Sequence, residues 1–190
     1  MTDSLPPLQL REPTPGLRTI IKSQYLASLA MMREAIEKCP DDLWLDKARY
    51  PNACWQIAYH ALFIGHLYLS DTMDSFRPWR GHRPDAQHPD GLPGTADPDS
   101  DLPLLPEPYT RDEALELCGV CEDTVVGAVD GFDLKSDASG FDWYKLSKLE
   151  HQFIAIRHIQ HHAAQLIDRL RSECDTGVGW AGSRRKQLEE

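Results

Sequence analysis

Apolar residues recur at helical spacing in four stretches of the chain, and no stretch shows the strict alternation that is typical of a half-buried strand. The first stretch, residues 16–38, is followed by Cys39-Pro40, which predicts the end of a helix. Its apolar face consists of Ile21, Tyr25, Leu29, Met32 and Ile36. The second stretch, residues 52–69, is apolar nearly all round, as in a helix deep inside a bundle, and Asn52 is its expected N-cap.

The third and fourth stretches both begin with the sequence pattern of a helix cap. Residues 110–129 open with Thr110 and carry Glu113 three positions later, and residues 146–173 contain Ser147 and Glu150 at the same spacing. In such a capping box each side chain pairs with the backbone N–H of the other residue. The third helix is expected to bury Ala114, Leu117, Cys121 and Val125.

Residues 70–109, between the second and third expected helices, have a different composition. They hold eight of the fourteen prolines, three glycines and seven aspartates, with no regular period. An irregular connection of this length can cross from one end of a bundle to the other. The sequence therefore predicts an all-α fold, a single domain over residues 1–190 built as an antiparallel four-helix bundle with a long Pro-rich crossover.

Charge and composition exclude several classes of protein. The net charge of −10, from 30 acidic and 20 basic side chains, disfavours a nucleic-acid binder because such a surface repels phosphate backbones. No apolar run approaches the roughly 20 residues that span a bilayer, and the N-terminus lacks the basic and apolar regions of a secretory signal. We therefore expect a cytoplasmic protein, whose five cysteines are free thiols.

The segment RHIQHHAAQL, residues 157–166, places three histidines in an otherwise apolar stretch. His158 and His162 are four residues apart, so their rings project from one helix face on successive turns. His161 lies about 100° further round, toward solvent. A histidine pair at this spacing is a familiar clamp for a divalent metal, although histidines on an exposed helix edge can also bond only to water or carboxylates.

The second expected helix offers a third imidazole. His60 shares a face with Ile57 and Ile64 and so points inward, whereas His66 lies about 240° away from it. A lone inward histidine is more often a hydrogen-bonded core residue than a ligand, but a bundle can bring His60 opposite the His158 and His162 pair. Three neutral imidazoles would hold Zn²⁺, Ni²⁺, Fe²⁺ or Mn²⁺ and leave a coordination position open for water or substrate.

The pattern WQIAYH on the second helix, together with SKLE and RHIQHHAAQL on the fourth, resembles the DinB-like superfamily of metal-binding four-helix bundles. The resemblance covers roughly residues 15–172. It implies that His60, His158 and His162 bind one divalent metal. Relatives in that superfamily include thiol S-transferases that use bacillithiol or mycothiol, and a mycothiol-dependent maleylpyruvate isomerase. The insert at 70–109 is longer than a minimal bundle of this kind needs, which weakens any transfer of substrate.

Three kinds of function are compatible with such a site. The first is a metal-dependent thiol S-transferase, which would use a low-molecular-weight thiol and a small-molecule substrate. The second is a hydrolase that uses a metal-activated water. The third is a non-catalytic metal-binding or stress-response protein that forms a homodimer through helix faces. Gln165 and His151, on the stripe of His158, and Trp55, one turn before His60, are candidate pocket residues, and Trp55 is equally compatible with packing.

Other motifs carry less weight. Cys118 and Cys121 form a C-x-x-C, but the pair lies two turns inside an expected helix, so we interpret both as small core residues. His82 and His88 lie in the polar insert and are expected to be solvated. The chain contains no Gly-rich phosphate loop and no nucleophile elbow, so a nucleotide cofactor or a serine nucleophile has no visible motif.

Overall fold

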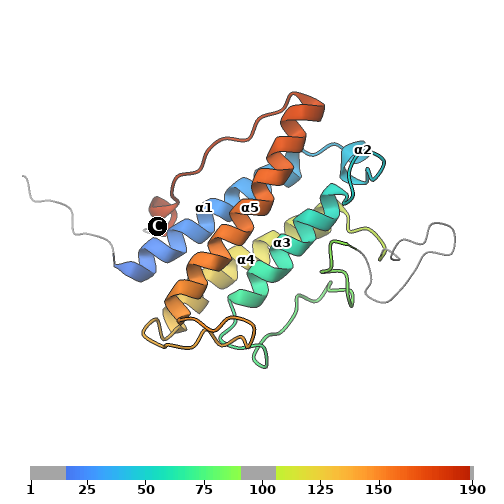
Figure 1. The fold of residues 1–190 in the computed structure, drawn as a ribbon. Helices are drawn as coiled ribbons and strands as arrows, with labels where there is room; N and C mark the ends of the chain where they lie inside the picture. The colour runs from blue at the N-terminus through green and yellow to red at the C-terminus, as the bar shows by residue number, and fades with distance from the viewer. Residues whose placement is uncertain (1–15, 91–105, 189–190) are drawn as a thin grey trace, which may run out of the picture.

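The computed structural model describes residues 16–90 and 106–188, and within these ranges every regular element is a helix (Figure 1). The four long helices are α1 (Leu17–Lys38), α3 (Cys54–Tyr68), α4 (Arg111–Gly131) and α5 (Lys148–Cys174). Each overlaps one of the four ranges expected from the sequence, so the all-α prediction is confirmed. Two short elements were not expected, namely α2 (Asp41–Trp44) and the 3-10 helix η1 (Arg185–Leu188).

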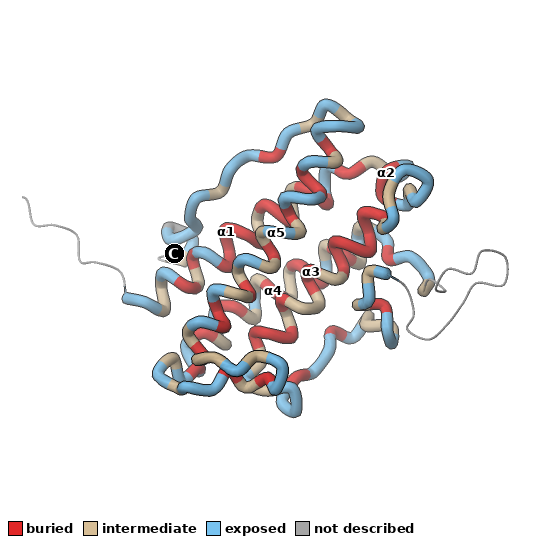
Figure 2. Tube along the Cα trace, viewed as in Figure 1, coloured by how far each residue is buried: buried red, intermediate tan, exposed pale blue. Residues whose placement is uncertain are grey.

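Helices α1 and α3 each pack against both α4 and α5. Buried residues follow the sides along which these helices meet, whereas exposed residues gather on the outer faces and in the connections (Figure 2). The expected apolar faces are buried. In α1 these residues are Ile21, Tyr25, Leu29, Met32 and Ile36, and in α4 they are Ala114, Leu117, Cys121 and Val125. Burial of this apolar surface is the main favourable contribution to the folding free energy.

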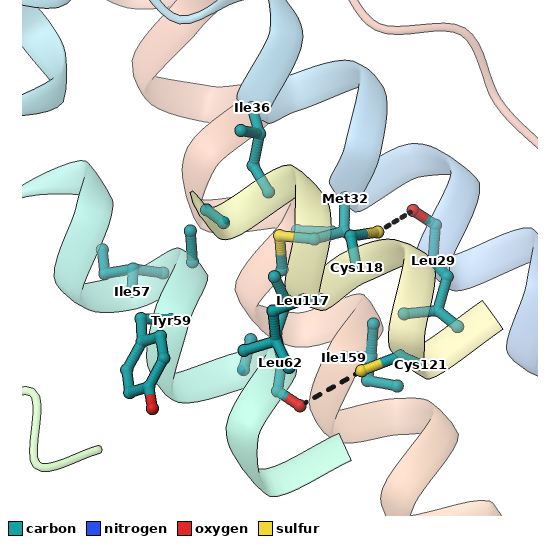
Figure 3. Packing of buried hydrophobic residues seen from close by; sticks show 14 of the residues in the cluster. Leu29, Met32, Ile36, Ile57, Tyr59, Leu62, Leu117, Cys118, Cys121 and Ile159 are labelled. Atoms are coloured by element: carbon teal, nitrogen blue, oxygen red, sulfur yellow. Dashed lines mark hydrogen bonds between the residues drawn. The ribbon is translucent and has the colours of Figure 1, made fainter. Parts of the chain in front are cut away.

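The C-x-x-C of α4 lies inside this core (Figure 3). The Cys118 thiol donates to the carbonyl of Leu29 in α1 at 3.8 Å, and the Cys121 thiol donates to the carbonyl of Leu62 in α3 at 3.5 Å. Burial raises the pKa of both thiols, which keeps them protonated. The interpretation of both as small core residues is confirmed.

Two of the three expected helix caps differ from the prediction. Thr110 and Glu113 form the full capping box, in which each side chain accepts from the other residue's backbone N–H. At α5 only Ser147 accepts, from the N–H of Glu150 at 3.2 Å. Asn52 is not the N-cap of α3, because its side-chain amide instead donates to the carbonyl of Pro89 at 2.6 Å. The helix begins one residue later, after Ala53, whose N–H donates to the Gln56 side chain.

Between α3 and α4, residues 69–90 and 106–110 contain turns and bends but no helix or strand. Tyr109 fixes this segment to the helices. Its ring stacks on Tyr59 of α3 with centroids 4.0 Å apart, and its hydroxyl donates to the Gly81 carbonyl and accepts from the N–H of Arg83. The described part of the insert is therefore irregular but packed onto α3. The rest of the insert, residues 91–105, lies outside the described residues.

Among the described residues, no helix is both long and apolar enough to cross a membrane.

Candidate metal centre

Three histidines from two helices meet in one group. His60 of α3 and His158 and His162 of α5 each offer a ring nitrogen, and these three atoms lie within 4.8 Å of one another. The Nε2 atoms of His60 and His158 are 3.2 Å apart. The three rings meet edge to face, with centroids 4.6 to 5.0 Å apart. Within residues 16–90 and 106–188, no other cluster of three histidine, cysteine or acidic side chains converges in this way.

The close approach of α3 to α5 brings the histidines together. At Gly65 of α3, a Cβ atom would lie 3.0 Å from Cδ1 of Ile159, so any larger residue would require the Ile159 side chain to shift. Ile159 follows His158 directly on α5. Since His158 and His162 are four residues apart, their rings stand on successive turns and face His60 across the gap.

Hydrogen bonds fix the orientation of two of the rings. His60 Nδ1 lies 2.8 Å from the carbonyl of Gln87, and His162 Nδ1 lies 2.7 Å from Oε1 of Gln165. A carbonyl oxygen only accepts, so Nδ1 carries the proton in both rings. The lone pair of Nε2 is therefore free in His60 and His162, which is the tautomer that a metal ligand requires.

Burial keeps all three imidazoles neutral near pH 7. Desolvation is the main cause that lowers the pKa of His158, to about 3, and the neighbouring His162 and His60 lower it further. Desolvation also lowers the pKa of His162 to about 4, and it lowers the pKa of His60 while the Gln87 carbonyl acts in the opposite direction. No proton has to be displaced from a charged ring before a cation binds.

The donor set fits a divalent transition metal. With Zn–N bonds of about 2.0–2.1 Å and tetrahedral angles, two ligand nitrogens are about 3.3 Å apart, close to the 3.2 Å between His60 and His158. Three protein ligands leave at least one position for an exogenous ligand. The three histidines are only partly buried, and a surface hollow of about 530 Å³ lies beside His158, lined also by Arg157 and His161. The group is therefore partly open to solvent, and the hollow borders it at His158 but not at His60 or His162.

The insert forms part of this site, which the sequence did not indicate. Asn52, Gln56 and His60 are spaced four residues apart, and all three donate to backbone carbonyls of the insert. Asn52 and Gln56 donate to Pro89, and His60 donates to Gln87. A polar residue at every fourth position of an otherwise apolar helix was the available signal. The accepting carbonyls belong to the backbone, so residue types could not reveal them.

Gln165 bonds directly to His162, but the other two candidate pocket residues lie elsewhere. His151 is buried among Tyr68, Phe141 and Tyr144, with ring centroids 4.6 to 5.3 Å away. Seven helical residues separate His151 from His158, a rise of about 10 Å, so a shared stripe does not mean a shared site. Trp55 is buried in the core and packs near Tyr109, with centroids 6.3 Å apart.

Two further histidines were considered for the site. His161 is exposed on α5 and stays outside the group, although its ring is 4.9 Å from that of His162. Of the two insert histidines expected to be solvated, His88 is exposed, whereas His82 is partly buried. Its ring stacks on Phe63 with centroids 4.8 Å apart, and its Nδ1 lies 2.7 Å from the Tyr59 hydroxyl.

Comparisons with known proteins add no relative. No family model matches the chain, and neither a curated protein nor a solved structure matches it. Any assignment of function therefore depends on the histidine group and its surroundings.

Proposed function

We propose that this chain is a DinB-like metalloprotein in which His60, His158 and His162 bind one divalent transition ion. The observation that carries the proposal is the convergence of three ring nitrogens within 4.8 Å from two separate helices. We also propose that the four long helices form an antiparallel bundle in which the Pro-rich insert is the crossover. The packing of both α1 and α3 against α4 and α5 supports this arrangement.

Three features support the metal site beyond proximity. The nitrogens belong to neutral imidazoles, which suit zinc, nickel, iron and manganese. The hydrogen bonds to Gln87 and Gln165 hold the tautomer that points Nε2 of His60 and His162 inward. A hydrogen-bonded carbonyl behind a histidine also increases the basicity of the ligand nitrogen.

We propose further that the protein is a metal-dependent thiol S-transferase that acts on a small-molecule electrophile. A divalent ion at this site would lower the pKa of a bound thiol and so supply a thiolate nucleophile at neutral pH. The chain's own residues would bind and orient the thiol and the electrophile. The exposed Arg157 beside the hollow suits a carboxylate of a low-molecular-weight thiol, because a guanidinium pairs with carboxylates in a bidentate manner.

A Co²⁺-substituted protein tests the transferase proposal. Addition of bacillithiol, mycothiol, glutathione or coenzyme A, each at micromolar to millimolar concentration, should produce a sulfur-to-cobalt charge-transfer band with at least one of them. The thiol that gives the band should then be consumed with an electrophile in a turnover assay. His158→Ala should lose the band together with the metal, whereas His161→Ala should keep it.

The same experiment separates the competing functions. A cobalt spectrum that no thiol changes would rule out the transferase but leave the metal site standing. Ester or amide hydrolysis by that protein would then indicate a metal-activated water, and inactivity toward both classes of substrate would indicate a non-catalytic metal-binding protein.

A further inference from the structure

The connection between α4 and α5, residues 132–147, covers a buried histidine at the end of the helices opposite α2 (Figure 1). We call this connection the cap. The covered residue is His151, in the first turn of α5, and its side chain is fully buried. Its ring is surrounded by Tyr68 of α3 and by Phe141 and Tyr144 of the cap, with centroids 4.6 to 5.3 Å away. Two of the three surrounding rings therefore belong to the cap.

The cap contains no helix or strand, but hydrogen bonds around Ser139 brace it internally. The Ser139 hydroxyl accepts from the N–H of Phe141 at 3.0 Å and donates to the carbonyl of Tyr144 at 2.7 Å. The N–H of Tyr144 also donates to the Phe141 carbonyl at 3.0 Å. The two rings that cover His151 are therefore held relative to each other, so the cap can move as one piece.

Polar contacts and close packing hold the cap in place. At its end, the Lys148 ammonium donates to the Asp71 carbonyl at 2.6 Å and lies 3.2 Å from the Asp71 carboxylate, at the start of the insert. Gly140 has a φ of +95°, and a Cβ atom there would clash with the Asp71 carbonyl. On the α3 side, the indole N–H of Trp143 donates to the Tyr68 hydroxyl at 3.3 Å. The closed cap thus leaves little space around His151.

His151 has no group nearby that would accept a second proton's charge. Neither of its ring nitrogens has a hydrogen-bond partner within residues 16–90 and 106–188. The titratable and charged groups of the elements packed here are Tyr68 of α3, Tyr144 of the cap, Lys148 of α5, Asp71 of the insert and Tyr25 of α1.

None of these groups is a free carboxylate. The Asp71 carboxylate is paired with Lys148, and the Tyr25 hydroxyl donates to Gln152, the residue after His151. A protonated His151 would therefore be a buried cation close to an ammonium, without a carboxylate to pair with. Exposure to water would remove this cost.

We propose that the cap is released in acid, when protonation of His151 moves residues 132–147 away from Tyr68 and Asp71 while the four long helices stay packed. In the open form, water hydrates the imidazolium and hydrogen-bonds to both of its N–H groups. The opening also exposes the rings of Phe141 and Tyr68, so the protein gains an apolar surface that the closed form buries. The proposal does not depend on the metal centre, since His151 is not part of the histidine group.

Proton linkage gives the direction and the size of the effect. Desolvation, with the Lys148 ammonium adding to it, lowers the pKa of His151 from 6.5 to about 4 in the closed form. In the open form the ring is hydrated, so its pKa returns to about 6.5. The open form therefore binds the proton more tightly, and the ratio of open to closed molecules should rise about twentyfold between pH 7 and pH 5.

The test is hydrogen exchange, measured by mass spectrometry on the full-length protein at pH 7 and pH 5 and corrected for the effect of pH on intrinsic amide exchange. The protein is kept free of metal, so that loss of an ion in acid cannot contribute. We expect the opening equilibrium of residues 133–146 to rise about twentyfold. Low concentrations of urea should leave this opening unchanged, because it exposes little surface, whereas opening of residues 25–36 in α1 should respond to urea.

One variant and one matched control assign the effect to His151. His151→Phe keeps an aromatic ring under the cap but cannot take up a proton, so the rise at pH 5 should disappear. His161→Phe makes the same change at an exposed histidine of the same helix and should keep the wild-type rise.

Three results would overturn the proposal. The first is an opening of residues 133–146 that does not rise at pH 5, or that rises equally in His151→Phe. The second is an opening that depends on urea as steeply as that of α1, which would mean global unfolding. The third comes from the wild-type protein alone: an NMR titration in which the His151 ring of the folded protein has an ordinary pKa near 6.5. The test therefore does not require that the variant folds.

Discussion

The three histidines of the candidate centre differ in how they are held. His60 donates to a backbone carbonyl and His162 to a side-chain amide, so both rings are fixed from behind. The Nδ1 atom of His158 is buried and has no hydrogen-bond partner among residues 16–90 and 106–188. Since Nε2 of His60 has a free lone pair, a proton on Nε2 of His158 is donated to it across 3.2 Å, and a bound cation would take the place of that proton between the two nitrogens.

Removal of the hydrogen bond between His162 and Gln165 should weaken metal binding. We expect Gln165→Ala to reduce zinc affinity by about tenfold, at the low end of the usual range because this hydrogen bond is solvent-exposed. Competition with a coloured chelator measures the affinity. Gln160→Ala is the matched control, since the Gln160 amide donates to the Met31 sulfur at 3.7 Å, and its loss should leave the affinity unchanged. Equal losses in the two variants would contradict a specific role for Gln165.

We expect His151 to affect the stability of the fold at acidic pH and not the affinity for metal. Both of its ring nitrogens lack a hydrogen-bond partner within the described part of the chain, and desolvation, with Lys148 adding to it, lowers its pKa from 6.5 to about 4. As the pH falls, the unfolded chain therefore takes up this proton before the folded chain does. The stability that depends on a neutral His151 is fully present above pH 6.5 and is lost as the pH falls toward 4. The loss from this one group is up to about 3 kcal/mol.

His151→Phe keeps an aromatic ring among the same neighbours and removes the titration. In metal-free protein, the free energy of unfolding of the variant should fall less between pH 7 and pH 4 than that of the wild type. Urea unfolding at several pH values measures the difference. The exposed His161 provides the control, because His161→Ala should keep the wild-type slope. A His151→Phe slope equal to the wild-type slope would show that His151 is not the titrating group.

At the scale of elements, α3 is the helix that connects the core, the insert and the candidate site. Its apolar sides pack on α4 and α5, while Gln56 and His60, together with Asn52 just before the helix, donate to the carbonyls of Pro89 and Gln87. The inward position of His60 was predictable from its apolar neighbours in the sequence. The fold of the insert was not, because it depends on single contacts such as the Tyr109 stack on Tyr59 and not on a period.

Loss of one α3 contact should loosen the insert without unfolding the helices. In Gln56→Ala the Pro89 carbonyl loses a 2.7 Å hydrogen bond, and the N–H of Ala53 loses its acceptor. We expect faster amide exchange in residues 82–90 and metal affinity reduced several-fold, since the carbonyl that orients His60 lies in the same segment. Hydrogen exchange measured by mass spectrometry checks this, with Gln160→Ala again as control. Unchanged exchange in residues 82–90 would contradict the anchoring role.

At the scale of the whole molecule, the sequence was most informative where a residue pattern repeats and least where contacts cross the chain. The apolar period predicted four helices, and the i, i+4 histidines predicted one face of α5. The prediction that His151 lies at the site was wrong, because a shared helix face gives the direction of a side chain around the helix but not its distance along the helix.

A metal that binds only the folded state must stabilise the whole chain. At a free zinc concentration of 100 times the dissociation constant, the gain is about 2.7 kcal/mol, which corresponds to a rise of several degrees in melting temperature for a chain of this size. Thermal unfolding of the metal-free protein with and without zinc measures the shift. His158→Ala should show no shift, and a shift of wild-type size in that variant would indicate binding elsewhere.

The most direct test of the central claim is the stoichiometry of metal uptake by the metal-free protein. Equilibrium dialysis followed by elemental analysis should find one divalent ion per chain. His60→Ala, His158→Ala and His162→Ala should each abolish tight binding, while His161→Ala, one residue from His162 but exposed, should retain it. Uptake that survives in His60→Ala, or that is lost equally in His161→Ala, would contradict a centre formed by α3 and α5 together.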